Sequence, residues 1–457
     1  MRGLVFLNNH HIHLIGVGGI SMSGLAEILI SKGFFVSGSD INHSDSVKYL
    51  ETLGLKFYNG HTAENIVGAD TVVYTAAVSS ENPELVAAHA AGARVIPRSV
   101  LLGEIMANYK HSVAVAGTHG KTTTTSMISY IFEKLSLDPT ILVGARLDII
   151  DSNMKLGKSD YFIAEACEYH RSFLDFKPYC ETILNVEPDH LDYYKDADDY
   201  HSAYTEFLKR VSPDGFVVAC ADDADLMEMI KNLPVKVIPY GISSENARVQ
   251  ARNILATDKT ASYDLYIDNS FVCKVSLSVF GKHNILNSLA ALANAYMFGL
   301  DLEKAALALA DFKGADRRFE YKGEFGGASV YDDYAHHPTE IKATLESALM
   351  MPHNNIICVF QPHTYSRTKI FLNEFAHSFK GADKLILAPI YAAREAFDPS
   401  VSSADVCALA VNDGIDAVCI DKFDDIAKFV KSLAKEGDII LVIGAGDIVK
   451  LTDKILG

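Results

Sequence analysis

The sequence lacks the features that mark a secreted or membrane protein. Its seven cysteines are scattered singly, without a C-x-x-C pair, so reduced thiols are expected. No stretch of about 18 apolar residues occurs, so no membrane-spanning helix is predicted. The N-terminal segment carries one arginine and a short apolar run that ends in polar residues, unlike a secretory signal. These absences together predict a cytoplasmic protein.

The sequence also lacks a long basic run, and its formal net charge is −17. A nucleic-acid backbone is therefore an unfavourable partner. If such an acidic protein handles anionic substrates, it must place lysines, arginines and helix N-termini locally. The 457 residues, of which 49% are hydrophobic, are enough for two to four domains with sizeable cores.

The most informative stretch present is a glycine loop between an apolar run and a helical pattern. The β-branched run at 113–116 ends in Gly117, and Gly120, Lys121 and Thr122 follow before the helical pattern. Strand, glycine loop and helix form the arrangement that binds a phosphate chain. In such a loop Lys121 would contact the β- and γ-phosphates, and the Thr122 hydroxyl would bind Mg²⁺. The spacing is shorter than G-x-x-x-x-G-K-[ST], and an ordinary helix start is the alternative.

A second glycine turn lies near the N-terminus. A strand at 12–15 leads into it, a helix follows, and a second strand ends at Asp40. The turn contains Gly16, Gly18, Gly19 and Gly24. This is a dinucleotide-type βαβ unit, with the acid about 20 residues beyond the glycines, where it could bind ribose hydroxyls. A tight turn without a ligand is the alternative. Further strands at 71–75 and 94–97 and helices at 83–91 and 100–107 complete a Rossmann-like domain.

Three histidines precede this turn, at positions 10, 11 and 13. They could form a metal tract, but their spacing fits the start of a strand equally well, and no carboxylate accompanies them. We favour the strand.

Carboxylates follow two apolar strands in the middle of the chain. The strand at 161–165 ends in Glu165, beyond which ligands bind in an open parallel sheet. Glu165 is therefore placed to bind the Mg²⁺ of ATP, and Glu168 could substitute for it. The alternative is that Glu165 is an ordinary acidic residue on the surface. The strand at 182–186 ends in the polar cluster Glu187, Asp189, His190 and Asp192. That cluster could hold a second cation or form a hydrogen-bonded turn.

Two helices are predicted in the second half of the middle region. One covers 197–208 and the other 281–295, and between them residues 212–275 indicate only short strands and turns. Asn284 and Asn287 lie in the first turns of the second helix. Their amides could cap the helix or bind an adenine edge.

The last segment alternates strands and helices from about residue 329, which indicates a second doubly wound sheet. Strands are expected at 329–333, 356–360, 384–387, 417–420 and 438–443, and Pro338 suits an early helical position. Arg317 and Arg318 suit phosphate recognition or form an exposed basic pair. His336 and His337 could be a structural pair. Polar residues gather at the strand ends: Asp332, Asp333, Tyr334, His336, His363 and Arg367.

The motifs together resemble the Mur ligase family across essentially the whole chain. The motif G-T-H-G-K-T-T is shared by the wider family, which includes folylpolyglutamate synthases, whereas G-V-G-G-I-S-M-S-G-L-A-E, H-H-P-T-E and F-Q-P-H-T-Y-S-R-T are narrower marks. The resemblance implies an α/β protein of three domains. They are a Rossmann-like domain at 1–108 for the UDP-sugar, a central P-loop ATPase-type domain at 109–314, and a Rossmann-like domain at 315–457 for the amino acid and ATP.

The resemblance also implies a role for each matching residue. The expected ATP-binding residues are Gly117, Thr118, His119, Gly120, Lys121, Thr122, Thr123, Asn284, Asn287, Arg318 and Asp333. The expected UDP-sugar residues are Gly16, Gly18, Gly19, Ser21, Asp40 and His61. The expected amino-acid residues are Tyr334, His336, His363 and Arg367, and the expected Mg²⁺ ligands are Thr122, Glu165 and His190. Some members carry Arg where Thr364 stands, so this chain has one cation fewer there.

The narrower motifs imply ATP-dependent ligation of L-alanine to the lactyl carboxylate of UDP-N-acetylmuramate, the first step of peptidoglycan stem peptide assembly. The carboxylate is first phosphorylated, and the alanine amine then attacks the acyl phosphate. Lys121 and Arg318 would stabilise the phosphoryl charge, and His336 would accept the amine proton or orient alanine. A recycling ligase that joins a murein peptide to the same UDP-sugar is the alternative. A nucleotide-binding regulator would keep Lys121 but would not need Glu165, His190 and the distal His/Arg set.

Overall fold

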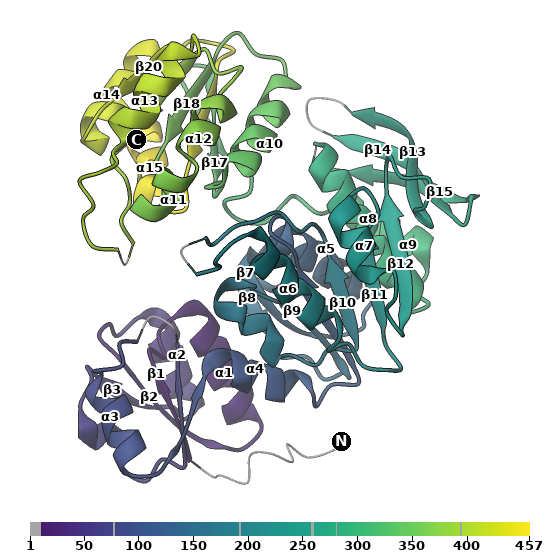
Figure 1. Ribbon diagram of the computed structural model, residues 1–457, viewed down its shortest axis with the longest axis vertical. Coiled ribbons are helices and arrows are strands. Elements are labelled where there is room, and N and C mark those ends of the chain that lie inside the picture. The colour runs from purple at the N-terminus through teal and green to yellow at the C-terminus, as the bar shows by residue number, and fades with distance from the viewer. Residues whose placement is uncertain (1–10, 76–77, 192, 257–259, 280, 394) are drawn as a thin grey trace. The chain divides into compact units, whose positions relative to one another are not determined.

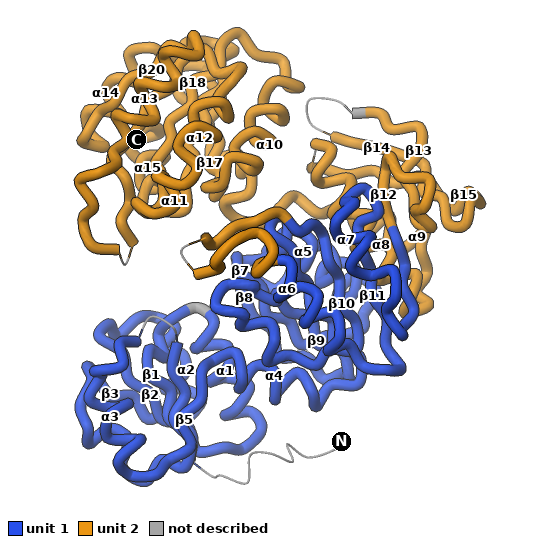
Figure 2. The backbone as a smooth tube through the Cα atoms, in the orientation of Figure 1, with its two compact units in different colours: residues 1–186, 201–239 blue, residues 187–200, 240–457 orange. Residues whose placement is uncertain are grey.

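The structure, a computed structural model, describes residues 11–75, 78–191, 193–256, 260–279, 281–393 and 395–457. Within these residues the strands form a five-stranded, a ten-stranded and a six-stranded sheet, each accompanied by helices (Figure 1). The expected α/β architecture with three sheet-bearing parts is confirmed. The chain divides into two compact units, Met1–Val186 with His201–Pro239 and Glu187–Tyr200 with Tyr240–Gly457 (Figure 2). None of the described helices is both long and apolar enough to span a bilayer.

The five-stranded sheet has the order β3-β2-β1-β4-β5, and all its described pairings are parallel. Its strands are β1 (His11–Ile15), β2 (Phe35–Asp40), β3 (Lys56–Asn59), β4 (Thr71–Tyr74) and β5 (Arg94–Pro97). Its helices are α1 (Ile20–Ser31), α2 (Asp45–Leu53), η1 (Ala63–Ile66), α3 (Pro83–Ala90) and α4 (Arg98–Met106). The strand order reverses at β1, with β2 and β3 on one side of it and β4 and β5 on the other. That switch point places the turn after β1 and the ends of β2 and β3 at one edge.

The ten-stranded sheet has the order β15-β14-β13-β12-β11-β10-β6-β9-β7-β8. Its first strands are β6 (His111–Ala116), β7 (Thr140–Leu147), β8 (Ser152–Lys155), β9 (Tyr161–Glu165) and β10 (Cys180–Ile183). The later strands are β11 (Phe216–Cys220), β12 (Lys236–Gly241), β13 (Val249–Ala256), β14 (Ala261–Ile267) and β15 (Ser270–Leu277). The associated helices are α5 (Lys121–Lys134), η3 (Tyr169–Asp175), α6 (Ala197–Leu208), α7 (Ala224–Ile230), α8 (Lys282–Met297) and α9 (Leu302–Ala310). The predictions of helices at 197–208 and 281–295 are confirmed. The region 212–275, predicted as short strands and turns, contains β11 to β14, most of β15 and also the helix α7, which was not predicted.

The six-stranded sheet has the order β16-β17-β21-β18-β19-β20. Its strands are β16 (Glu320–Phe325), β17 (Ala328–Asp333), β18 (Ile356–Phe360), β19 (Lys384–Leu387), β20 (Ala417–Cys419) and β21 (Ile439–Ile443). Its helices are α10 (Pro338–Leu349), α11 (Tyr365–Ile370), α12 (Leu372–Ser378), α13 (Ser403–Asn412), α14 (Phe423–Leu433) and α15 (Lys450–Leu456). Only the β16–β17 hairpin is antiparallel among the described pairings of this sheet. Apolar side chains on both faces explain the near-continuous hydrophobic strands, and Pro338 opens α10 as predicted.

Each sheet has a strand that is buried on both faces. All five residues of β1, β18 and β21 are buried, and so are the last five residues of β6. Removing that apolar surface from water stabilises the fold by about 25 cal/mol per Å². The strand ends are polar, so each rigid core presents functional side chains at the carboxyl edge of its sheet.

One buried carboxyl does not fit this pattern. Glu181, in β10, is 0% exposed, and neither carboxyl oxygen has a hydrogen-bond partner within the described residues. Burial raises the pKa of Glu181 well above its usual value, and the nearby guanidinium of Arg210 offsets this only in part. The protonated form of Glu181 is therefore favoured in the folded protein. The stability of the fold that depends on this protonated carboxyl is present at low pH and is lost as pH rises through the folded-state pKa.

We expect Glu181→Met to stabilise the protein, by more at pH 8 than at pH 5. Methionine fills a similar volume without a group that must be deprotonated in an apolar site. The expected gain at pH 8 is about 1–3 kcal/mol, the usual cost of an unsatisfied buried polar group. Scanning calorimetry of both proteins at several pH values measures it. An equal shift in melting temperature at every pH would show that the carboxyl does not titrate in this range.

Candidate active site

The loop between β6 and α5 has the geometry of an anion-binding turn. Gly120 adopts φ 85° and precedes α5, whose N-terminus has no side-chain cap. Gly117 adopts φ 144°, and a Cβ there would lie 2.9 Å from the Cβ of Leu184. Only glycine fits both positions. The uncapped N–H groups at the start of α5 are left to bind an anion.

Asn185 holds this loop in place from the end of β10. Its side-chain oxygen accepts the His119 N–H at 2.8 Å, and its amide nitrogen donates to the His119 carbonyl at 3.1 Å. The Thr118 N–H donates to the Asn185 carbonyl. Asn185 was not among the predicted site residues, because its role depends on β6 and β10 being neighbours. Its only sequence signal was its place at the end of an apolar strand.

Lys121 is the first residue of α5, and its ammonium group is held by oxygens. The Nζ atom lies 3.0 Å from the Thr118 carbonyl and 2.9 Å from a carboxylate oxygen of Glu168. Burial opposes the charge of Lys121, but the carboxylate of Glu168 outweighs burial and raises the lysine pKa. The lysine is therefore charged at neutral pH and lies beside the glycine turn. Glu168, suggested as a substitute Mg²⁺ ligand, is the counter-ion of Lys121 in this structure.

Thr122 and Glu165 form an adjacent pair of oxygen ligands. The Thr122 hydroxyl donates to Glu165 Oε2 at 3.1 Å. The Gly144 N–H donates to Glu165 Oε1 at 2.5 Å, and a Cβ on Gly144 would lie 2.9 Å from that oxygen. A hydroxyl beside a carboxylate fits the oxygen preference of Mg²⁺. The oxygen atoms of Thr122 and Glu165 are therefore ligands of the kind that the predicted Mg²⁺ role requires.

The N-terminal glycine turn is held by the acid at the end of β2. Asp40 Oδ2 accepts the Gly18 N–H at 3.0 Å, and a Cβ on Gly18 would lie 2.9 Å from that oxygen. Gly19 precedes α1, which has no side-chain cap, and Ser21 lies in the first turn. One role of Asp40 is therefore to fix the turn, and its predicted role toward ribose stays a prediction.

His11 and His13 belong to β1, as the strand interpretation requires. The two rings hydrogen-bond the same hydroxyl, that of Ser37, at 2.8 Å each. His10 lies outside the described residues.

The asparagines of α8 do not cap the helix. Its N-cap residue is Gly281, which has no side-chain cap hydrogen bond among the described residues. Asn287 donates to Asn284 Oδ1 at 3.3 Å, and Asn287 is buried. The capping alternative is therefore wrong, and the adenine role stays a prediction.

The two adjacent arginines have different surroundings. Arg317 pairs with Asp332 at 3.0 Å and also donates to the Gly444 carbonyl at 2.6 Å. The Arg318 guanidinium lies 3.9 Å from Glu340, a looser contact than those of Arg317. Both guanidinium groups lie over the ring of Tyr334. Arg317 is therefore a structural residue, and Arg318 is the arginine whose charge remains available for a phosphate group.

Asp333 organises the turn at the end of β17. Its two oxygens accept the N–H groups of Phe319 at 3.0 Å and Ala335 at 2.7 Å. Burial raises the pKa of Asp333 to about 6, although Arg318 acts in the opposite direction. The predicted contact of Asp333 with ATP would come on top of this structural role.

The four predicted amino-acid residues gather at the carboxyl edge of the six-stranded sheet. The His336 ring centroid lies 5.5 Å from that of Tyr334 and 5.8 Å from that of His363. Arg367 donates to His363 Nδ1 at 3.3 Å. These contacts bring the four side chains together, and their role toward the amino acid stays a prediction.

Asp189 is an additional member of this group. It lies 3.2 Å from Arg367, and the Arg367 guanidinium holds the pKa of the buried Asp189 carboxyl well below its usual range. The sequence placed Asp189 only in a polar cluster, and its partner in the last segment could not be predicted. Asp192 of the same cluster lies outside the described residues. His190, the proposed Mg²⁺ ligand, lies 3.7 Å from Asp189.

Both histidines of the group are neutral at pH 7. Burial lowers the pKa of His336 to about 3 and that of His363 to about 4, and the Arg367 charge acts in the same direction. His336 Nδ1 lies 3.0 Å from the Tyr334 carbonyl, so Nδ1 carries the proton and Nε2 is left as an acceptor. A ring with so low a pKa is a weak base, which favours orientation of the incoming amine over proton abstraction.

Backbone strain accompanies several of these positions. Thr364, where some family members carry arginine, adopts φ 67°, and His190 adopts φ 54°. A positive φ is uncommon for any residue with a side chain and most costly for a β-branched one. Glu395 supports the strained turn by accepting the N–H groups of Tyr365 and Ser366 at 2.6 and 3.0 Å. Such strain is consistent with a functional constraint.

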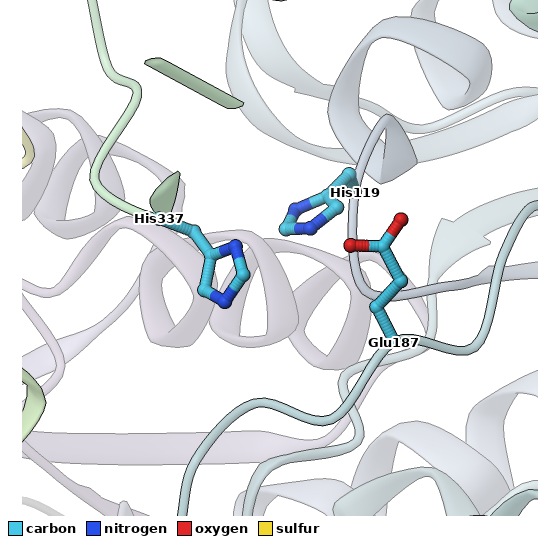
Figure 3. Close-up of side chains that lie close together, drawn as sticks. All are labelled: His119, Glu187 and His337. Carbon is cyan, nitrogen blue, oxygen red and sulfur yellow. The ribbon is translucent and has the colours of Figure 1, made fainter. Parts of the chain in front are cut away.

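Figure 3 draws three further polar side chains, His119, Glu187 and His337. His119 lies on the loop between β6 and α5. His337 is the N-cap of α10 and forms a capping box with Glu340, so its main role is structural. Glu187 accepts a hydrogen bond from the Thr339 hydroxyl at 2.9 Å.

Protein-family models match most of the chain. The model of the Mur ligase middle domain matches residues 115–295, that of the Mur ligase family catalytic domain matches residues 11–110, and that of the Mur ligase glutamate ligase domain matches residues 317–446. The chain is 50% identical over 97% of its length, and 97% of the relative's, to UDP-N-acetylmuramate–L-alanine ligase of Caldanaerobacter subterraneus subsp. tengcongensis. It is 48% identical to the protein of the same name from Clostridium botulinum strain Langeland, over 97% of this chain and 96% of the relative.

Solved structures also match the chain over nearly its whole length. UDP-N-acetylmuramate-alanine ligase MurC from Thermotoga maritima matches with a TM-score of 0.81 and 28% identity, covering 98% of both chains. A murein peptide ligase from Psychrobacter arcticus matches with a TM-score of 0.71 and 25% identity, again over 98% of both chains.

Proposed function

The chain belongs to the Mur ligase family, and we propose that it ligates L-alanine to the lactyl carboxylate of UDP-N-acetylmuramate, with conversion of ATP to ADP and phosphate. The observation that carries this proposal is the 50% identity over 97% of the chain to a relative named for that reaction. The predicted amino-acid residues also lie together around Arg367. This would be a cytoplasmic step of peptidoglycan assembly.

The reaction must activate a poor electrophile. A lactyl carboxylate oxygen attacks the γ-phosphorus of ATP, and ADP leaves with the electrons of the broken P–O bond. The alanine amine then attacks the acyl carbon, and phosphate leaves. Charge builds on the transferring phosphoryl group, and Lys121 and Arg318 are the cations proposed to stabilise it.

Mg²⁺ is part of this proposal, with Thr122, Glu165 and His190 as the residues that would hold it. When bound, Mg²⁺ neutralises phosphate charge and aligns the phosphate chain. The Thr122 hydroxyl already donates to Glu165, so the two oxygens are pre-positioned by protein contacts. The negative charges of ATP, ADP and phosphate are complementary to the Mg²⁺ that such a site would hold.

Arg367 is proposed to bind the alanine carboxylate. In this structure it holds Asp189, a carboxylate, at 3.2 Å. Both oxygens of Asp189 lie within reach of Arg367 Nη2, so Asp189 occupies the position of a substrate carboxylate or orients the guanidinium for it. His336 and His363 would then orient the amine through neutral rings.

Arg367→Ala and His363→Ala are expected to raise the KM for L-alanine by about 30-fold or more while ATP affinity changes little. Loss of a charge-assisted hydrogen bond costs about 2 kcal/mol, and each 1.4 kcal/mol is tenfold in affinity. Steady-state kinetics with alanine varied, together with calorimetry of ATP binding, measure the two effects. Lys369→Ala is the matched control, since Lys369 lies on the same helix and pairs with Ser400 and Asp398. Equal losses for ATP and alanine would assign Arg367 to the nucleotide site.

The experiment that tests the function is incubation with ATP, Mg²⁺ and UDP-N-acetylmuramate plus one amine substrate. L-alanine, glycine, L-serine and the murein tripeptide are compared for phosphate release and for the ligated product. Efficient use of L-alanine with little use of the tripeptide supports the proposal. A preference for the tripeptide would instead establish the recycling ligase alternative. The structural comparison favours that alternative less, because the Psychrobacter murein peptide ligase matches with a TM-score of 0.71 and the Thermotoga MurC with 0.81.

A further inference from the structure

A fully buried carboxylate lies beneath the loop that carries His61. Glu84 is in the first turn of α3, after the N-cap Asn82 and Pro83, and it is 0% exposed. The helix N-terminus favours a negative charge at this position. The sequence analysis did not single out Glu84, and the reaction proposed above does not use it.

Both oxygens of Glu84 accept hydrogen bonds. Oε2 accepts from the Ser39 hydroxyl at 2.7 Å and from His61 Nδ1 at 2.8 Å. Oε1 accepts from Asn65 Nδ2 at 2.7 Å, and His13 Nε2 lies 3.4 Å from it. These groups come from β1, the end of β2, the loop after β3 and η1. Burial would raise the pKa of Glu84, but the four hydrogen-bond donors outweigh burial and lower it, so the group is a carboxylate.

This arrangement determines which nitrogen of His61 carries the proton. The Ser39 hydroxyl has one hydrogen, which it donates to Glu84, and a carboxylate has none to donate. The Ser39 oxygen, 3.1 Å from His61 Nδ1, can therefore only accept from the ring. Nδ1 must be the donor, so in the neutral imidazole Nε2 has the lone pair. Within the part of the chain that the structure describes, the hydrogen bonds of His61 all involve Nδ1.

We infer that Glu84 is a positioning residue for nucleotide binding, because it holds His61 in one orientation with Nε2 as a hydrogen-bond acceptor for a donor group of the UDP moiety. This inference rests on the proposed function and on the UDP-sugar role that the family resemblance implies for His61. A uridine diphosphate offers two kinds of donor, the uracil N–H and the ribose hydroxyls. Asn65 contributes to the same end: it also donates to the Gly60 carbonyl at 3.0 Å, which fixes the backbone next to His61.

Glu84→Gln tests the inference because glutamine has one acceptor oxygen where glutamate has two. If the amide oxygen keeps Ser39 and His61, the NH₂ group faces the donor of Asn65. If it keeps Asn65, the NH₂ group faces His61 and imposes the other tautomer. In either case the variant loses the single arrangement of donors that the carboxylate enforces, and we expect the Kd for UDP to rise about tenfold.

The measurement is calorimetric titration of the full-length protein with UDP, for the wild type, Glu84→Gln, His61→Ala and the double variant. If Glu84 acts through His61, the double variant should bind UDP no more weakly than His61→Ala does. Ser37→Ala is the control: Ser37 is buried and bonds His11 and His13, but it has no bond to His61. It should leave the UDP affinity unchanged, and melting temperatures show whether each variant folds.

The inference is overturned if Glu84→Gln binds UDP as the wild type does, or if the losses in the double variant are additive. Additive losses, or an equal loss in Ser37→Ala, would mean that Glu84 only stabilises the domain. UDP binding does not require ligation, so the inference about Glu84 and the proposed function can be refuted independently of each other. A protein that binds UDP with this pattern but ligates no amino acid would retain the inference and lose the proposed function.

A pair of nucleotide analogues identifies the ligand donor. The wild type and His61→Ala are titrated with 2′,3′-dideoxyuridine diphosphate, which lacks both ribose hydroxyls, and with the diphosphate of N3-methyluridine. We expect one analogue to bind the wild type more weakly than UDP does and to lose little further affinity in His61→Ala. If both analogues bind the wild type as tightly as UDP, Nε2 accepts from neither group and the acceptor role is wrong.

Discussion

Replacing Lys121 with alanine is expected to abolish ligation. The ammonium group is the only cation that the first turn of α5 supplies, and it lies beside the uncapped N–H groups of the loop. Loss of a preorganised charge at a transferring phosphoryl group removes several kcal/mol of transition-state stabilisation. Turnover should therefore fall by a factor of about 1,000 or more. Retention of more than about a tenth of the wild-type rate would contradict the phosphate role of Lys121.

The substitution also has a structural effect that must be separated from catalysis. Lys121 is the counter-ion of Glu168, which is 1% exposed, and an unpaired buried carboxylate destabilises a fold by about 3–5 kcal/mol. The double variant Lys121→Met with Glu168→Gln removes both charges and should melt closer to the wild type, yet remain inactive. Lys134→Ala, at the other end of α5, is the matched control and should keep full activity. Activity in the folded double variant would show that Lys121 is a structural residue only.

Glu165→Gln is expected to raise the Mg²⁺ concentration for half-maximal rate by about tenfold or more, with a much smaller effect on the KM for the UDP-sugar. The amide keeps the shape and can still accept from Thr122 or Gly144, but it removes a hard anionic ligand that Mg²⁺ prefers. Rates measured across a Mg²⁺ titration at saturating substrates give the effect. The metal requirement is therefore the readout that distinguishes Glu165 from a surface acid.

Glu168→Gln serves as the comparison for this variant. Glu168 bonds Lys121 rather than Thr122, so its amide should change ATP affinity or the rate more than the Mg²⁺ requirement. If Glu168→Gln shifts the Mg²⁺ titration and Glu165→Gln does not, the metal ligand at this strand end is Glu168. An unchanged titration in both variants would remove Mg²⁺ from the proposed site.

The local motifs could be predicted from the sequence because their geometry is local. Gly117, Gly120 and Lys121 are contiguous with the strand and the helix that position them, and the structure has that strand, turn and helix. The same holds for the α8 helix and for Pro338 at the start of α10. The region 212–275 was predicted only as short strands and turns, since the strands β13 to β15 are stabilised by pairing with one another, although β14 alternates buried and half-buried residues.

Residues that depend on distant neighbours could not be found in this way. Asn185 holds the loop between β6 and α5 because β6 and β10 are adjacent, and Glu84 supports His61 across 23 positions of sequence. Both are single polar residues near apolar segments, a pattern that is common without function. The two arginines show the same limit. They are adjacent in sequence, but Arg317 is bound to Asp332 and Gly444, whereas Arg318 has a looser ion pair with Glu340.

The central claim is that the lactyl carboxylate is activated by phosphorylation, and an oxygen-transfer experiment tests it most directly. UDP-N-acetylmuramate labelled with ¹⁸O in its carboxylate is incubated with the protein, ATP, Mg²⁺ and L-alanine, and the phosphate released is analysed by mass spectrometry. Transfer of the γ-phosphoryl group to the carboxylate followed by amine attack predicts one ¹⁸O atom in each phosphate formed. Ligated product accompanied by phosphate without ¹⁸O would contradict the acyl phosphate route.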